Sequence, residues 1–229
     1  GQTMSPAGQA IARRLLASPA QAPAGAVASD VAERFEALGR LGAADPLARM
    51  IPAAPAALRD PTVVQFLAQA ELARGRTPQA CQRANAVASE TPGPFILRLR
   101  AYCFAAAGET AGADLALEVA RAGGATDPWL LSALPALTAP GKTLPPAGFD
   151  TVLNAAFSLA GRFRPAPGAR PLATASPLSA LLVAATETPN PALQAEAAFQ
   201  ALRAGAIGTD QARRIMFAAS QRPIPADLV

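Results

Sequence analysis

Apolar residues recur at helical spacing along most of the chain, and the strict alternation typical of a half-buried strand is nearly absent. Two proline-rich stretches, 139–148 and 161–176, lack this pattern, and we predict linkers or long surface loops there. The pattern predicts twelve helices, near residues 6–17, 30–40, 45–51, 61–74, 78–89, 93–107, 110–122, 128–137, 149–160, 177–186, 191–204 and 210–220.

Eight of the predicted helices begin with a polar residue followed directly by proline. The polar side chain accepts a hydrogen bond from a free backbone N–H, and proline at the first helical position loses no hydrogen bond there. The pairs are Ser5-Pro6, Asp45-Pro46, Asp60-Pro61, Thr77-Pro78, Thr91-Pro92, Asp127-Pro128, Ser176-Pro177 and Asn190-Pro191. Asp30 followed by Glu33 predicts a capping box. These signals together predict an all-α fold.

Three glycines, Gly75, Gly108 and Gly141, follow one another at intervals of 33 residues, each after a predicted helix. Small residues let paired helices approach closely, and a single hairpin does not bury its apolar face alone. When the glycines are aligned, small residues recur at equivalent positions of the first and second helices: Ala68 with Ala101, and Ala80 with Ala113.

In this pattern the chain resembles the tetratricopeptide repeat family, whose unit is a helix–turn–helix of about this length. Residues 61–90 and 94–123 look like two units and 128–141 like the first helix of a third, about a third of the chain. The family's aromatic positions hold mostly Ala, Leu or Glu, so related two-helix repeats fit as well. The resemblance implies an α-solenoid of stacked hairpins with a peptide-binding concave face.

The loops and the repeat divide the chain into three predicted parts. These are N-terminal helices in 1–58, hairpin repeats in 59–141 and C-terminal helices in 142–229. Pro145 and Pro146 prevent a second helix in the third unit. Because a repeat stack needs its exposed end covered, we predict that the helices from residue 149 onward cap it.

Composition favours closely packed helices, because hydrophobic residues make up 51% of the chain and aromatic residues only 5%. The net charge is +4, but the arginines are scattered and no aromatic residues interleave with a basic stripe. We therefore expect no nucleic-acid partner. No apolar run approaches the ~18 residues that cross a bilayer, so we expect no transmembrane segment. Residues 1–6 lack the features of a signal peptide.

The two cysteines are predicted to form a disulfide, with buried free thiols and a redox pair as the alternatives. If helices 78–89 and 93–107 form an antiparallel hairpin, Cys81 and Cys103 lie equally far from the turn at Pro92. Facing positions permit the ~5.5 Å Cα separation of a disulfide. A disulfide indicates an oxidising compartment, so we predict a periplasmic or secreted protein.

Candidate catalytic chemistry is sparse. Residues 136–143 match a relaxed phosphate-binding loop that includes the only lysine, Lys142, but a helix rather than a strand precedes it and prolines follow. The chain has no histidine, which excludes histidine-dependent nucleophiles and most zinc catalysis. Two carboxylates alone support a glycosidase-like mechanism, yet pairs such as Asp114 and Glu118 are typical of solvated faces. We predict no enzyme, no catalytic residue, no cofactor and no metal.

The aromatic residues give the candidate contacts. Tyr102 and Trp129, each the only one of its kind, are predicted as core anchors rather than ligand contacts. In the loop after residue 160, Arg162 and Arg164 flank Phe163, and we name these three as candidate partner-binding residues. An ordinary exposed loop is the alternative.

The predicted function is a non-catalytic protein-binding or scaffolding component of a bacterial cell envelope or secreted assembly. The bacterial origin is inferred from the high Ala, Arg and Pro content. The expected partner is another protein or peptide. The alternative is a helical accessory domain that contacts anionic polysaccharide or cell-wall glycan.

Overall fold

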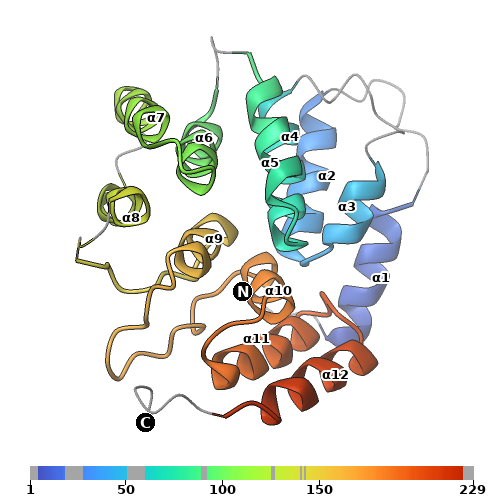
Figure 1. The fold of residues 1–229 in the computed structure, drawn as a ribbon. Helices are drawn as coiled ribbons and strands as arrows, with labels where there is room; N and C mark the ends of the chain where they lie inside the picture. The colour runs from blue at the N-terminus through green and yellow to red at the C-terminus, as the bar shows by residue number, and fades with distance from the viewer. Residues whose placement is uncertain are drawn as a thin grey trace.

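The computed structural model describes residues 5–18, 28–50, 60–88, 92–124, 127–139, 141 and 143–223, and these contain twelve helices and no strand (Figure 1). The all-α prediction is confirmed, and each predicted helix has a counterpart. The helices are α1 (Pro6–Leu16), α2 (Ala28–Arg40), α3 (Ala44–Met50), α4 (Pro61–Ala73), α5 (Thr77–Ala86), α6 (Pro94–Ala106), α7 (Thr110–Ala122), α8 (Pro128–Thr138), α9 (Val152–Ala160), α10 (Pro177–Ala185), α11 (Pro191–Arg203) and α12 (Thr209–Ser220).

Four helical hairpins, α2–α3, α4–α5, α6–α7 and α11–α12, share one turn. The first helix of each has 13 residues, and a glycine with φ between 66° and 76° follows it. The glycine N–H bonds to the carbonyl three residues back at 2.8–3.0 Å, and the next N–H to the carbonyl five back at 2.8–2.9 Å. This Schellman arrangement satisfies helix carbonyls and requires a left-handed residue. The glycines are Gly42, Gly75, Gly108 and Gly205.

The 33-residue period extends one hairpin further than the sequence analysis placed it, because Gly42 precedes Gly75 by the same interval. Gly141, at the end of α8, also has a positive φ, of 79°. The four alanines predicted at helix contacts, Ala68, Ala80, Ala101 and Ala113, are all 0% exposed. Small side chains therefore occupy the positions where paired helices meet.

The C-terminal helices pack against the first helices of the hairpins. Helix α9 contacts α4, α6 and α8, while α10 contacts α2 and α4. In Figure 1, α9 and α10 accordingly lie between the α2–α8 helices and the α11–α12 hairpin. The predicted cap thus covers α8 and also lies along the side formed by α4 and α6. One hydrophobic core, from Phe35 in α2 to Ala212 in α12, runs through all three predicted parts, so the domain division stays a prediction.

Aromatic packing ties the hairpins to the C-terminal helices. Tyr102 is 4% exposed, and its ring centroid lies 4.8 Å from that of Phe157 in α9. Trp129 meets Phe157 and Phe163 at 6.0 and 6.2 Å, and its Nε1–H donates to the Pro146 carbonyl at 2.8 Å. Tyr102 is a buried core residue, as predicted, whereas Trp129 is half-buried and packs against the core from outside.

Five of the eight predicted caps accept a hydrogen bond from a backbone N–H of the helix: Ser5, Asp60, Asp127, Ser176 and Asn190. Two were wrong, because α3 begins at Ala44, before Asp45, and α5 begins at Thr77 itself after an N-cap at Arg76. Thr91 lies outside the described residues.

Two further helix starts were misplaced. The capping box was wrong, because α2 begins at Ala28, so that Asp30 lies in its first turn. Helix α9 begins at Val152 rather than at residue 149, and there Thr151 supplies a cap that the sequence analysis did not identify. Within the described part, no helix has the length and apolar character needed to span a membrane.

Candidate ligand groove

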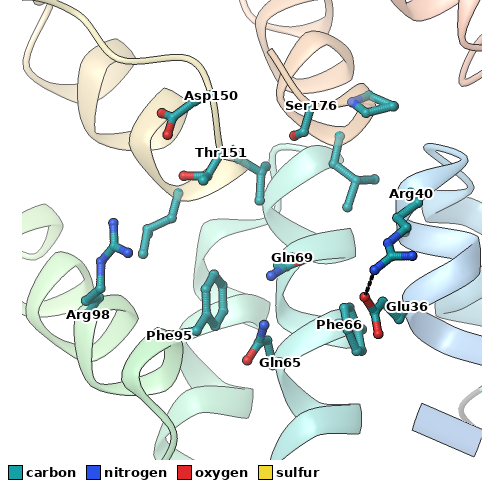
Figure 2. A pocket seen from close by; sticks show the side chains of 15 residues that line it. Glu36, Arg40, Gln65, Phe66, Gln69, Phe95, Arg98, Asp150, Thr151 and Ser176 are labelled. Carbon is teal, nitrogen blue, oxygen red and sulfur yellow. Dashed lines mark hydrogen bonds and ion pairs between the residues drawn. The ribbon is translucent and has the colours of Figure 1, made fainter. Parts of the chain in front are cut away.

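A cavity of about 460 Å³ lies between the first helices of three consecutive hairpins and the C-terminal helices (Figure 2). Helices α2, α4 and α6 form one side, and the N-terminal ends of α9 and α10 form the other. We call this cavity the groove. It exists because the N-terminal ends of α9 and α10 lie opposite α2, α4 and α6.

Amide and aromatic side chains of α4 and α6 form the floor of the groove. Gln65 and Gln69 are one helical turn apart on α4, so both face the same side, with Phe66 beside them. Phe95 of α6 adds a second half-buried ring. Neither glutamine has a hydrogen-bond partner in the part of the chain that the structure describes. Figure 2 shows these four side chains between Arg98 and Arg40.

The charged groups at the two ends of the groove are held by neighbours. Arg98 donates to Asp127 at 2.8 Å and to Asn154 at 3.0 Å, and Asn154 in turn donates to Asp150 at 2.9 Å. At the other end Arg40 pairs with Glu36 (Figure 2). The Nε–H of Arg98, by contrast, is buried without a hydrogen-bond partner. The groove therefore offers unpaired amides rather than a concentrated charge.

The sequence-predicted loop residues lie at a separate cavity of about 620 Å³. Arg162, Phe163 and Arg164 all line it, together with residues that precede α11. Phe163 is only 6% exposed and packs against Trp129, which differs from an aromatic ring presented by an exposed loop. The two arginines are exposed, so of the three candidate residues only they are open to solvent.

Cys81 and Cys103 lie at bonding distance, with Sγ atoms 1.98 Å and Cα atoms 5.7 Å apart. The bond joins α5 of one hairpin to α6 of the next. The same register brings the Arg100 guanidinium to the Ala84 carbonyl, at 2.9 and 3.1 Å. Two contacts thus place the helices as the sequence analysis expected.

The other candidate motifs gather no further groups. Helix α8 runs to Thr138, within the phosphate-loop match, and residues 143–149 are not helical. Lys142 lies outside the described residues. Asp114 is exposed, and Glu118 pairs with Arg121 at 2.9 Å. Across the described ranges, no three Cys, Asp or Glu side chains come together as metal ligands would.

The sequence analysis missed the groove residues, although the 33-residue period carries a signal for them. Glu36 and Gln69 occupy equivalent positions of successive first helices, and so do Gln65 and Arg98. Polar residues at matching positions indicate a shared face. The helices that close this face, α9 and α10, come from far along the chain, and no local pattern places them.

Fold and groove define an all-α protein of helical hairpins with a cavity along their first helices. Comparison with protein-family models, with curated protein sequences and with solved structures finds no match.

Proposed function

We propose that the chain is a non-catalytic protein-binding or scaffolding component that takes an extended peptide segment of its partner into the groove. The main support is the floor of the groove, where the unpaired side-chain amides of Gln65 and Gln69 lie beside the Phe66 and Phe95 rings. An extended peptide presents both N–H and C=O groups, which side-chain amides can pair, and apolar side chains, which aromatic rings can bury.

A tetratricopeptide-like α-solenoid is part of this proposal. Its support is the 33-residue period, the common glycine turn and the buried alanines at equivalent positions. In such an arrangement the first helices of successive hairpins line one continuous face. The groove lies on the first helices of three hairpins, which agrees with that geometry.

The proposed location is outside the cytoplasm, in a bacterial periplasm or in the secreted fraction. The cysteine pair at bonding distance supports it, because structural disulfides persist mainly in oxidising compartments. The absence of catalysis is also proposed. The only carboxylates among the groove-lining residues, Glu36 and Asp150, are engaged by Arg40 and Asn154.

The test is selection of binding peptides from a displayed random library, followed by affinity measurement by fluorescence polarisation. We expect an enriched peptide family whose affinity falls about tenfold or more in the double variant Phe66→Ala, Phe95→Ala, because buried aromatic anchors dominate such interfaces. The matched control is Leu115→Ala, Val119→Ala, which removes two exposed apolar side chains from α7 and leaves binding unchanged. Enriched peptides that bind the groove variant as well as the wild type contradict the proposal.

The alternative function, contact with anionic polysaccharide, is favoured by one observation: Arg162 and Arg164 line the same cavity. Its signature differs from that of peptide binding. Affinity for an anionic glycan is lost in Arg162→Gln, Arg164→Gln and falls with added salt. Peptide binding in the groove is unaffected by those two substitutions.

A further inference from the structure

A third cavity, of about 520 Å³, gathers four arginines from α1, α3 and the α4–α5 turn. It lies where the turn of the first hairpin meets the turn of the last one, with Gly42 and Gly205 in its wall. A Cβ on Gly42 would come within 2.9 Å of Ala206, so the two turns are in close contact. The cavity shares no lining residue with the groove. The arginines are Arg13, Arg49, Arg74 and Arg76.

Carboxylates balance only one of these four charges. Asp45, the one acidic residue that lines the cavity, pairs with Arg74 at 2.9 Å, and Glu71 lies 3.6 Å from the same guanidinium. The side chains of Arg49 and Arg76 are exposed and make no hydrogen bond or ion pair in the described part of the chain. Two cations therefore border the cavity without a protein partner.

Arg13 is the third unbalanced cation. It donates to the Leu41 carbonyl at 2.8 and 3.1 Å and to the Ala204 carbonyl, so neutral acceptors fix its position. Burial without a carboxylate lowers the pKa of the Arg13 guanidinium from its usual value. An anion in the cavity would favour the charged form. The carbonyl contacts hold this guanidinium in place before any ligand arrives.

Two helix N-termini lie at the cavity, but Asp210 in the first turn of α12 offsets the positive end of that helix. Helix α5 begins directly after Arg76, and α12 begins near Ile207 and Gln211, which line the cavity. Neither helix has a side-chain hydrogen bond at its N-cap. The arginine side chains define the site, and the N-terminal end of α5 only strengthens its attraction for negative charge.

We propose that this cavity binds a compact polyanion of the phosphate or pyrophosphate class. Planar guanidinium groups bind phosphate oxygens through paired hydrogen bonds. Three unbalanced cations match a multivalent anion better than a single carboxylate, because a monovalent ligand leaves most of the charge unpaired. The apolar wall of Leu181, Ala185 and Ile207 leaves room for an organic substituent.

The experiment is isothermal titration of the full chain with sodium pyrophosphate, and with inorganic phosphate for comparison. We expect saturable binding, tighter for pyrophosphate, that weakens with added salt and falls at least tenfold in Arg49→Gln, Arg76→Gln. The matched control is Arg213→Gln, Arg214→Gln, which removes the same charge from two exposed arginines of α12 that do not line the cavity. The control is expected to bind pyrophosphate as the wild type does.

Melting temperatures measured without ligand distinguish an effect of the substitutions on folding from an effect on binding. Because Arg49 and Arg76 repel each other and Arg13, their double variant is expected to melt no lower than wild type, and pyrophosphate is expected to raise the melting temperature of wild type alone. No pyrophosphate binding at millimolar concentration overturns the proposal, and so does equal weakening in the control variant.

Vesicles containing phosphatidic acid identify the source of the phosphate group. If the wild type binds pyrophosphate and also sediments with these vesicles, and the Arg49→Gln, Arg76→Gln variant does not sediment, the phosphate group belongs to a lipid headgroup. Pyrophosphate binding without sedimentation assigns it to a soluble ligand. Both results support the cavity as a phosphate site.

Discussion

Several arginines serve at helix C-termini rather than as solvated surface charges. Arg13 donates to carbonyls at the ends of α2 and α11, Arg34 to those at the end of α1, and Arg100 to those of Ala84 and Val87 at the end of α5. The last carbonyls of a helix lack partners within it, and a guanidinium has five donors in a planar fork. This geometry suits arginine and not lysine, and every basic residue except Lys142 is arginine.

One arginine adopts a left-handed backbone conformation that glycine adopts in the four hairpin turns. Arg162 has φ 51°, the only positive φ of a non-glycine residue in the described ranges. Its N–H bonds to the Leu159 carbonyl, and the next N–H bonds to the Ser158 carbonyl at 2.9 Å, as in the four hairpin turns. Strained backbone conformations cluster at functional sites. The binding role of Arg162 is therefore tested separately from its effect on stability.

Replacing Arg162 with glycine is predicted to stabilise the fold by about 0.5–1 kcal/mol. Relief of a left-handed conformation, worth about 1–2 kcal/mol, exceeds the added freedom of glycine in the unfolded chain, about 0.4–1 kcal/mol. Urea unfolding followed by circular dichroism measures the change. Arg170→Gly, at an exposed loop residue with negative φ, serves as the control and is expected to destabilise slightly. A lower urea midpoint for Arg162→Gly than for wild type contradicts the argument.

At the scale of elements, local chemistry predicted the helices and most of their starts, and tertiary partners explain two failures. The carboxylate of Asp45 pairs with Arg74 at 2.9 Å instead of capping α3. The Thr77 hydroxyl hydrogen bonds with Tyr102 instead of capping α5. Both side chains were expected to bond within their own helix. A more distant partner competed for each, and no cap rule includes such partners.

The disulfide is predicted to be fully formed in native protein and to stabilise the junction between consecutive hairpins. Closing a loop between Cys81 and Cys103, a separation of 22 residues, contributes roughly 3 kcal/mol through the unfolded state. Reduction, or the double change to Ala, is therefore expected to lower the melting temperature by several degrees while helical content is retained. Differential scanning calorimetry and circular dichroism measure the two quantities.

The same bond tests the proposed compartment. Mass spectrometry of non-reduced protein is expected to find the two cysteine peptides linked, and alkylation in freshly quenched cells is expected to find no free thiol. Two alkylatable thiols in protein that was never reduced would refute the disulfide and remove the support for an oxidising compartment. Free thiols trapped by alkylation in cells, together with a disulfide that forms only after purification, would refute the proposed compartment but not the disulfide.

At the scale of the whole molecule, the ligand cavities arise from contacts between segments far apart in the chain. The groove needs α4 and α6 together with α9 and α10, and the arginine cavity needs α1, α3 and the turn before α12. Periodicity indicates which face of a helix is apolar, but it does not specify which distant helix covers that face. The sequence therefore predicted two of the four hairpins and the disulfide register, while the packing of α9 and α10 along α4 and α6 emerged only from the structure.

Tyr102 reports on that packing, because its ring lies between the hairpins and Phe157 of α9. Burial raises the pKa of the Tyr102 phenol above its usual value of 10.0, and a hydrogen bond with Thr77 opposes this in part. Well below pH 10.0 the Tyr102 phenol is protonated in both the folded and the unfolded state, and its burial contributes fully to stability. As the pH rises further the unfolded chain ionises first, so the free energy of unfolding falls until the folded-state pKa is passed.

We predict that phenolate absorbance, which comes from this tyrosine alone, rises at a higher pH in native protein than in denaturant. The native rise is expected to accompany loss of helical circular dichroism, because hydroxide reaches the phenol only when α6 and α9 separate. Phe157→Leu, which loosens the contact without touching the phenol, is expected to lower the native midpoint toward the denatured one. Tyr102→Phe is expected to remove the absorbance change and to flatten the loss of stability just above pH 10.0. Identical midpoints in native and denatured protein would mean that the phenol is open to solvent and that α9 does not hold the hairpins as described.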